Sequence, residues 1–445
     1  MKRRTFVIIG LIIALTVAGA ILLYLYPLYS GKNENKDSII SIDYWTHSDY
    51  ARNTLEERLI AEFEKANPGI RINRTIYTSS ELLNILPNAI SAGRGPVLFN
   101  LQQDYLAHII EGGYLSPADY VSIGYSSMDD VISDYIDDAF YGCTKDGVIY
   151  GIPMEFTNWC LYINKTKFRE AGLDPETDYP KTWEEMVEVC EKLVSREDGI
   201  LTERGFDFRY PHFLTFFVPM VQQLGGDILD ENGNLAIVGE EAWEKAFSFM
   251  QEWGPLGRNL GSPTYKNART VFNEGDIAMM LSGLYHEERL RVANPELFES
   301  GEWMVVPFPV FENGKRVSSA KYCHYWSVNA SSSEKEQEAA WKFIGYLADH
   351  AEEYLEEACL LPPKRSIVDN LDSYTIPYSS VFSSDIEYSS FVYSGADAVD
   401  FKETIETLMK EVMLLGLSPE KAVIRLKIAV LEMNYKGQTG RESLY

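Results

Sequence analysis

The sequence contains few cysteines and no pair of them at short spacing. The five cysteines are Cys143, Cys160, Cys190, Cys323 and Cys359, in a chain of 445 residues. A C-x-x-C pair is typical of structural zinc sites and redox motifs, and no such pair is present. An odd number of cysteines also leaves at least one thiol outside any disulfide. We therefore expect small buried side chains here, and neither disulfides nor a metal site.

Basic residues are also scarce. The chain has 40 Lys and Arg against 66 Asp and Glu, so its formal net charge is −26. A body of this charge repels nucleic acid and anionic membrane surfaces, so no nucleic acid is expected as a partner. The hydrophobic content of 46% is typical of a globular chain with a full core. Acidity alone does not indicate a ligand.

Local catalytic and cofactor motifs are missing. The stretch "YHEER" at 285–289 lacks the second histidine of a zinc protease motif, and "SAGRGP" at 91–96 lacks the lysine of a phosphate-binding loop. The acidic turn at 227–232 lacks the central glycine and closing glutamate of a calcium loop. We expect no catalysis, no cofactor and no metal. A carboxylate pair for glycoside hydrolysis needs no local motif, so a glycan-degrading enzyme stays as an alternative.

Charged residues are absent from residues 5–26, directly after three basic residues at 2–4. A secretory leader has an apolar core of about 7–15 residues, whereas a membrane-spanning helix needs about 20. The basic start predicts a cytoplasmic N-terminus and an exported remainder. We interpret 1–29 as a retained transmembrane signal-anchor and 30–38 as a tether, with the globular body on the extracellular side of the cell membrane. A cleaved leader and a buried core helix are the alternatives.

Segments with strand and helix patterns alternate along the rest of the chain. Residues 38–45 and 96–101 have strand patterns, and 53–69 has apolar residues at helical spacing before a sharp Asn-Pro-Gly stop. Residues 225–238 have the composition of a hairpin, and 333–349 has a helical pattern. A helix predicted over 80–93 is expected to break or kink at Pro87. The alternation predicts an α/β fold with a largely parallel sheet.

Four stretches resemble the type 1 extracellular solute-binding proteins, the receptors of carbohydrate importers driven by ATP hydrolysis. The first is "IDYWTHSDYARNTLEERLIAEFEKANPGIRI" and the second is "GRGPVLFNLQQDYLAHIIEGGYLSPAD". The third, "YGIPMEFTNWCLYINKTKFREAGLDPETDYPKTWEEM", is the most specific. The fourth is "FNEGDIAMMLSG", continued by "WMVVPFPV" and "AAWKFIGYLAD".

The resemblance implies a two-lobed periplasmic-binding-protein type II fold with hinge strands. Lobe one would comprise 38–153 and 327–375, and lobe two 158–320 and 395–445. The chain crosses between lobes near "IPMEF", near "KYCHYW" and within "YTIPYSSVFSSDIEYSS". The implied function is capture of a mono- or oligosaccharide by a monomer that delivers it to the permease subunits of an ABC importer. A non-sugar solute such as a polyamine is the alternative ligand.

A buried sugar needs flat aromatic platforms and polar groups that pair its hydroxyls. Side chains of both kinds follow predicted strand ends and crossings, where ligands of α/β folds bind. The candidate ligand-binding residues are Trp45, His47, Asp49, Gln102, Asp104, Tyr105, Glu155, Asn158, Trp159, Tyr285, His324 and Trp326.

Each candidate has a competing structural interpretation. A Trp beside a strand often packs in the core, Asp104 would cap a helix, and Glu155 would be a loop charge or a hinge contact. Trp45 and Tyr285 are assigned to opposite lobes, so one sugar stacked on both would bridge the cleft. The family often has an acid where this chain has Gln102, which leaves the exact sugar open.

Overall fold

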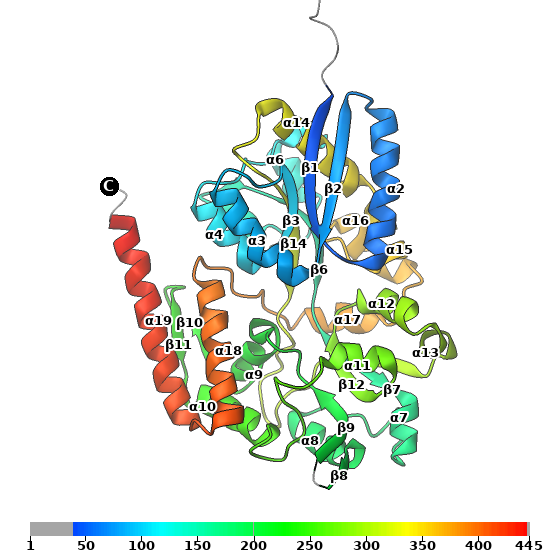
Figure 1. Cartoon of the computed structure of the whole chain (residues 1–445), viewed down its shortest axis with the longest axis vertical. Helices are drawn as coiled ribbons and strands as arrows, with labels where there is room; N and C mark the ends of the chain where they lie inside the picture. The colour runs from blue at the N-terminus through cyan, green and yellow to red at the C-terminus, as the bar shows by residue number, and fades with distance from the viewer. Residues whose placement is uncertain (1–38, 199, 443–445) are drawn as a thin grey trace, which may run out of the picture.

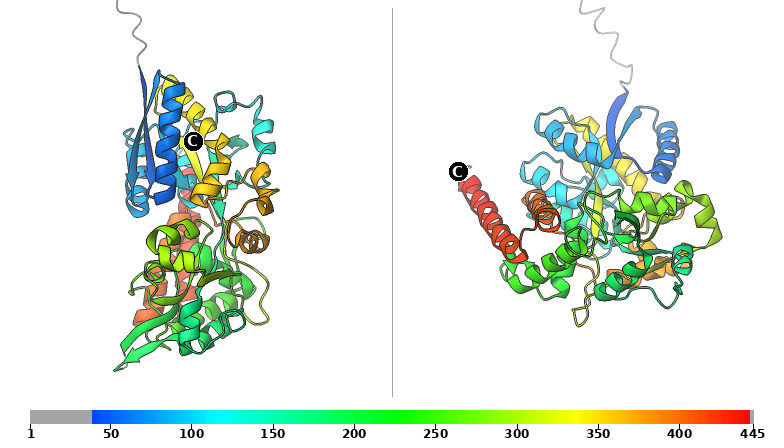
Figure 2. Two further views of the ribbon diagram at one scale, coloured as in Figure 1. Left: turned by 90° about the vertical axis from the view of Figure 1, so that its right-hand side faces the viewer. Right: turned by 60° about the horizontal axis from the view of Figure 1, so that its bottom comes forward.

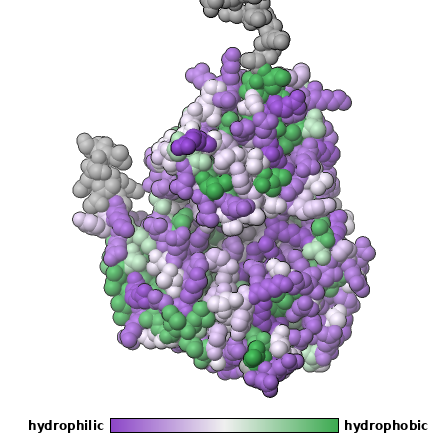
Figure 3. All heavy atoms as spheres, viewed as in Figure 1, coloured by the Kyte–Doolittle hydropathy of each residue, from purple (hydrophilic) through white to green (hydrophobic). Residues whose placement is uncertain are grey.

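Two five-stranded sheets divide the chain into two lobes, one above the other in Figure 1. The computed structural model describes residues 39–198 and 200–442. Both turned views keep the two bodies distinct, with the start of the described chain at the far end of the first lobe (Figure 2). The face in Figure 3 is mostly hydrophilic, with small separate groups of hydrophobic side chains.

The sheet of the first lobe has the order β2-β1-β3-β14-β6. Its strands are β1 (Ile40–His47), β2 (Ile70–Tyr77), β3 (Leu98–Gln102), β6 (Ile152–Thr157) and β14 (Tyr322–Val328). β1 runs parallel to β2 and β3, and β14 runs antiparallel to β3 and β6. In β1, buried residues alternate with more exposed ones, because one face of the strand packs on the core.

Helices pack around this sheet. They are α2 (Tyr50–Ala66), α3 (Ser79–Ser91), α4 (Gln103–Glu111), α5 (Tyr120–Ile123), α6 (Met128–Ser133), α14 (Glu334–Asp349), α15 (Ala351–Ala358) and α16 (Arg365–Val368), with a small hairpin of β4 (Thr144–Lys145) and β5 (Val148–Ile149). The carboxyl ends of β1 and β3 point toward the second lobe (Figure 1).

The sheet of the second lobe has the order β13-β7-β12-β9-β8. Its strands are β7 (Cys160–Asn164), β8 (Ser195–Glu197), β9 (Ile200–Asp207), β12 (Ile277–Ser282) and β13 (Trp303–Val306). β12 is parallel to β9 and antiparallel to β7. Every residue of β7 and β12 is buried, since helices cover both faces, and this explains their continuous apolar sequences.

The elements around the second sheet come from two parts of the chain. The first part contributes α7 (Lys165–Glu170), α8 (Trp183–Leu193), α9 (Phe213–Gln223), α10 (Glu240–Trp253), α11 (Ala268–Glu274), α12 (His286–Ala293), α13 (Pro295–Ser300) and the hairpin of β10 (Asp227–Leu229) and β11 (Leu235–Val238). The last part contributes α17 (Ser379–Ile386), α18 (Ala398–Leu415) and α19 (Pro419–Glu442). α18 packs on α10 and also contacts α4 of the first lobe.

Three connections join the lobes. Residues 158–159 link β6 to β7, residues 307–321 link β13 to β14, and the chain after α16 returns to the second lobe. The connections are tied together, because the Ser319 hydroxyl accepts from the Trp159 amide and donates to its carbonyl, and the Val392 amide donates to the Lys321 carbonyl. The segments predicted as the first two crossings form β6 and β14, which pair within the sheet of the first lobe.

Most predicted elements are confirmed. The strands at 38–45 and 96–101 correspond to β1 and β3, and the hairpin at 225–238 corresponds to β10 and β11. Ser333 caps α14 in a reciprocal capping box with Glu336. All five cysteines are buried and free, as expected.

The expected break at Pro87 is wrong, because α3 continues through it. A proline inside a helix leaves the carbonyl four residues earlier, here that of Leu83, without its usual donor. Leu83 and Pro87 both line a cavity, so this part of the helix is not packed tightly against another element.

The predicted anchor at 1–29 and tether at 30–38 lie outside the described residues. Among the helices that the structure describes, none is both long and apolar enough to cross a membrane.

Candidate ligand-binding cleft

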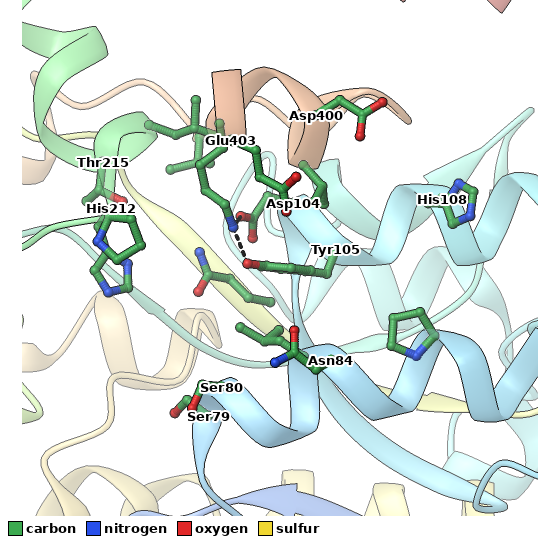
Figure 4. Close-up of a pocket in the computed structure, with 18 of the residues that line it drawn as sticks. Ser79, Ser80, Asn84, Asp104, Tyr105, His108, His212, Thr215, Asp400 and Glu403 are labelled. Carbon is green, nitrogen blue, oxygen red and sulfur yellow. Dashed lines mark hydrogen bonds and ion pairs between the residues drawn. The ribbon is translucent and has the colours of Figure 1, made fainter. Parts of the chain in front are cut away.

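A cavity of about 850 Å³ lies between the lobes. Its walls are α3 and α4 of the first lobe, and the start of α9, the start of α11 and α18 of the second (Figure 4). In Figure 4 Tyr105 lies between Asn84 of α3 and Glu403 of α18, and His212 and Thr215 close one side. The volume is typical of small-molecule sites, which occur preferentially between domains.

Three predicted site residues line this cavity where β3 passes into α4: Gln102, Asp104 and Tyr105. Burial raises the pKa of the Asp104 carboxyl, although Lys402 of α18 lies 4.0 Å away and opposes the rise. The Lys402 ammonium donates to the Tyr105 hydroxyl, which joins the second lobe to the first. Asp104 Oδ1 has no hydrogen-bond partner among the described residues.

An arginine–tyrosine cluster lies on the second lobe beside this cavity; it comprises Arg209, Arg269, Arg289 and Tyr285. Arg209 Nη1 donates to the Tyr285 hydroxyl at 2.8 Å, and the Arg289 guanidinium lies over the Tyr285 ring, 4.5 Å from its centroid. Arg269 lines the cavity itself. Arg209 and Tyr285 follow the carboxyl ends of the parallel strands β9 and β12, which explains why they meet.

Electrostatic interactions within the cluster are strong. Burial alone would raise the pKa of the Tyr285 phenol, but Arg209, Arg289 and Arg269 together lower it to about 7. Burial, with repulsion from Arg209 and Arg289, lowers the pKa of Arg269 to about 9. The two arginines that contact Tyr285 thus favour its negatively charged form.

Three more predicted site residues of the first lobe, His47, Glu155 and His324, lie together but do not line this cavity. His324 Nδ1 lies 2.9 Å from Glu155 Oε1, and the rings of His324 and His47 are 5.0 Å apart. Burial and Arg52 lower the pKa of His47 well below its usual value, so this ring is neutral at pH 7. Glu155 Oε2 has no hydrogen-bond partner in the part of the chain that the structure describes.

Two polar contacts close the cleft from its opposite sides. Asp49, which caps α2, accepts from Arg289 Nε at 2.9 Å and from Nη2 at 2.6 Å. The second contact is that of Lys402 with Asp104 and Tyr105. Because each contact joins one lobe to the other, the described conformation is a closed one.

Two predicted site residues do not face the cleft. Trp326 is 1% exposed and lies in the core of the first lobe, where its indole donates to Tyr44 Oη at 3.1 Å and packs edge-on against Tyr354. The Asn158 amide donates to the Phe382 carbonyl at 3.4 Å, toward α17. Both side chains are buried and donate a hydrogen bond within the protein, so we correct their assignment to structural roles.

The other two predicted tryptophans, Trp45 and Trp159, do not offer an uncovered ring on which a sugar could stack in this conformation. Trp45 is outside the cavity lining, and its ring packs edge-on against Tyr77 with centroids 5.1 Å apart. Trp159 is fully buried; its indole donates to the Tyr322 hydroxyl, and the Arg209 guanidinium covers its ring at 4.1 Å. Trp159 therefore supports Arg209, and the expected bridge between Trp45 and Tyr285 is not seen.

Sequence reasoning missed the three arginines, His212 and Lys402. The rule that selected Tyr285, a position after a strand end, also applies to Arg209, two residues beyond β9. That strand has the sequence "ILTERGFD", whose charged residues interrupt the hydrophobic pattern by which a strand is predicted. No group of three or more His, Cys, Asp or Glu among the described residues is arranged to hold a metal.

Two α/β lobes joined by three connections, with a polar cavity between them, define a two-lobed solute-binding architecture. The sequence profile of the bacterial extracellular solute-binding proteins matches residues 49–354, and the chain belongs to this family. The resemblance inferred from the sequence is thereby confirmed. Because the family consists of binding proteins, the chain is a binding protein and not an enzyme.

Similar proteins include an arabinooligosaccharide-binding protein of Halalkalibacterium halodurans, 24% identical over 68% of this chain and 70% of its own length. A solute-binding protein from Thermotoga lettingae bound with α-D-tagatose superposes with a TM-score of 0.76 at 20% identity, covering 88% of this chain and 98% of its own. The maltose/maltodextrin-binding domain of Bdellovibrio bacteriovorus, bound to maltotriose, gives a TM-score of 0.76 at 21% identity, covering 89% and 100%. The two structures confirm the two-lobed fold.

Proposed function

We propose that this protein captures a carbohydrate between its lobes and delivers it to the permease subunits of an ABC importer. The observation that carries the proposal is the cavity between the lobes, with Tyr105 in its centre and hydroxyl, amide and carboxylate side chains around it. Such a lining pairs sugar hydroxyls and offers an aromatic face to the ring. The similar proteins described above, one an arabinooligosaccharide-binding protein and one bound to maltotriose, support a sugar.

We assign the ligand-binding role to the predicted residues that surround the closed cleft. These are His47, Asp49, Gln102, Asp104, Tyr105, Glu155, Tyr285 and His324. Trp159 has an indirect role, because its ring packs under the Arg209 guanidinium. We keep the predicted lobes, 38–153 with 327–375 and 158–320 with 395–445, as part of this proposal, with β6 and β14 added to the first lobe because they pair in its sheet. We also propose that the protein acts as a monomer. A polyamine is the alternative ligand, because the cavity wall has Asp104, Asp400 and Glu403, which would attract it, beside Arg269 and Lys402, which would repel it.

A thermal-shift screen with mono- and oligosaccharides tests the proposal. A ligand that binds only the folded state raises the melting temperature. At a ligand concentration of 100 times its Kd, the free energy of unfolding increases by about 2.7 kcal/mol. We expect one group of related sugars to raise the melting temperature, and spermidine to leave it unchanged. A shift with spermidine and with none of the sugars would overturn the proposal.

We further propose that residues 1–29 form a retained anchor, which holds the receptor at the membrane beside its importer. The support is the uncharged run over 5–26 after a basic start. Mass spectrometry of the membrane fraction should find residues of this run covalently continuous with Lys32. A mature N-terminus between residues 20 and 32 would instead show a cleaved leader.

A further inference from the structure

Two arginines of the cleft have no carboxylate partner. Arg209 is 5% exposed, and its Nη1 donates to the hydroxyl oxygens of Tyr285 and of Ser282, the latter at 3.3 Å. Its Nε has no acceptor among the described residues. Within the described chain, neither Arg209 nor Arg269 lies within ion-pair distance of a carboxylate, although acids outnumber bases in the sequence by 66 to 40.

Three other arginines whose side chains are at most 10% exposed are paired with carboxylates. Arg52 and Arg74 both face Glu56, and Arg204 lies 2.6 Å from Asp207. Burying an unpaired charge is strongly unfavourable, which is why buried arginines normally have carboxylate partners. Burial, together with repulsion from Arg209, lowers the pKa of Arg269. This local excess of positive charge lies beside a ligand cavity, within a strongly acidic protein.

We propose that the arginine–tyrosine cluster binds the carboxylate of an acidic saccharide, a sugar chain that carries a single uronic acid. This inference rests on the proposed carbohydrate function and narrows its ligand class. Arg269 is the cluster residue that lines the cavity, so its planar guanidinium is the group that would contact the carboxylate. Arg209 does not line the cavity and adds its positive charge from behind it.

The α18 wall limits the ligand to one negative charge. Asp400 and Glu403 line the cavity there, and Asp104 faces them from α4 (Figure 4). Lys402 is the positively charged residue of α18 in this lining. It already donates a hydrogen bond to Tyr105 and forms an ion pair with Asp104. A polyuronate would bring its further carboxylates against these acids, so neutral sugar units are expected beside α18.

Tyr285 provides an internal readout of the anion. Its phenol faces Arg209, Arg269, Arg289 and the hydroxyl of Tyr322, and its pKa of about 7 reflects the positive charge around it. A carboxylate bound to these arginines reduces their effect and raises the Tyr285 pKa. Binding of an anion at pH 8 should therefore take up a proton and lower the tyrosinate absorbance. Tyr285→Phe should remove this change.

Calorimetric titration of matched pairs tests the proposal. The probes are di- and trisaccharides that end in glucuronic or galacturonic acid, their uncharged methyl esters, neutral maltotriose, trigalacturonate and inorganic phosphate. We expect one acid to bind at least about tenfold more tightly than its ester, which has the same shape without the charge, and more tightly than trigalacturonate. That order, with tyrosinate loss at pH 8, supports the proposal.

Substitutions locate the effect. Arg269→Gln, on the cavity wall, should reduce the preference for acid over ester to about twofold or less, and Arg209→Gln should act likewise if it folds. Arg258→Gln removes the same charge from the surface, where Arg258 pairs with Glu191 and Glu252, and should leave the preference intact.

The proposal is overturned if the esters or maltotriose bind as tightly as the acids, if phosphate or trigalacturonate binds more tightly, or if Arg269→Gln keeps the preference. In the first of these results a neutral sugar still binds, so the carbohydrate function stands while the acidic ligand fails. If no carbohydrate of any charge binds, the proposed function itself fails together with this inference.

Discussion

Replacing Trp326 with alanine should lower the free energy of unfolding by about 3–5 kcal/mol and leave the ligand affinity of the folded protein unchanged. The indole is buried between β14 and the helices of the first lobe, and it donates to Tyr44. Removing it leaves a large cavity and an unpaired hydroxyl acceptor. Denaturant unfolding gives the stability, and titration of the folded protein with its sugar gives the affinity.

Trp326→Phe is the matched control for this prediction. It keeps an aromatic ring against Tyr354 but removes the hydrogen bond to Tyr44, so its loss of stability should be smaller than that of alanine. If Trp326→Ala instead kept full stability and lost affinity, the residue would be a ligand contact, and its placement in the core would be contradicted.

Replacing Tyr285 with alanine should weaken ligand binding by roughly tenfold to a hundredfold, which corresponds to about 1.4–2.8 kcal/mol. The Tyr285 hydroxyl accepts from Arg209, and its ring lies under the Arg289 guanidinium, so it positions two arginines of the cleft. Since Tyr285 is 6% exposed in the closed form, some stability should also be lost. Affinity is measured by titration at a temperature where the variant is folded.

Tyr285→Phe separates the roles of ring and hydroxyl. It keeps the cation–π contact with Arg289 and loses the hydrogen bond from Arg209, so an intermediate affinity is expected. Unchanged affinity in the folded alanine variant would remove Tyr285 from the binding site and with it the central residue of the cluster.

The fold was largely predictable because its signals are local. The hydrophobic run of β3, the hairpin of β10 and β11, and the capping box at Ser333 each depend on a few neighbouring residues. Pro87 shows the limit of such reasoning. Its cost to a helix depends on how tightly other elements pack against that part of the helix, and here the neighbouring cavity is built by distant segments.

The binding site was predicted in part, for a related reason. Strand ends indicated Gln102, Asp104 and Tyr105, which do line the cavity. Trp326 could not be distinguished from a cleft residue, because only its position next to Tyr44, 282 residues earlier in the chain, makes it a core residue. Arg209 was missed because the charged sequence of β9 does not have a strand pattern.

Small-angle scattering with and without a saturating sugar tests the central claim most directly, namely that this is a two-lobed receptor that closes on its ligand. The sugar is the one that gives the largest thermal shift. The described conformation has Asp49–Arg289 and Asp104–Lys402 contacts across the cleft, so the liganded profile should match it. The account predicts a larger radius of gyration without sugar and a decrease on saturation, as ligand contacts to both lobes favour the closed state. An open profile that stays unchanged when calorimetry shows the site is full would contradict it.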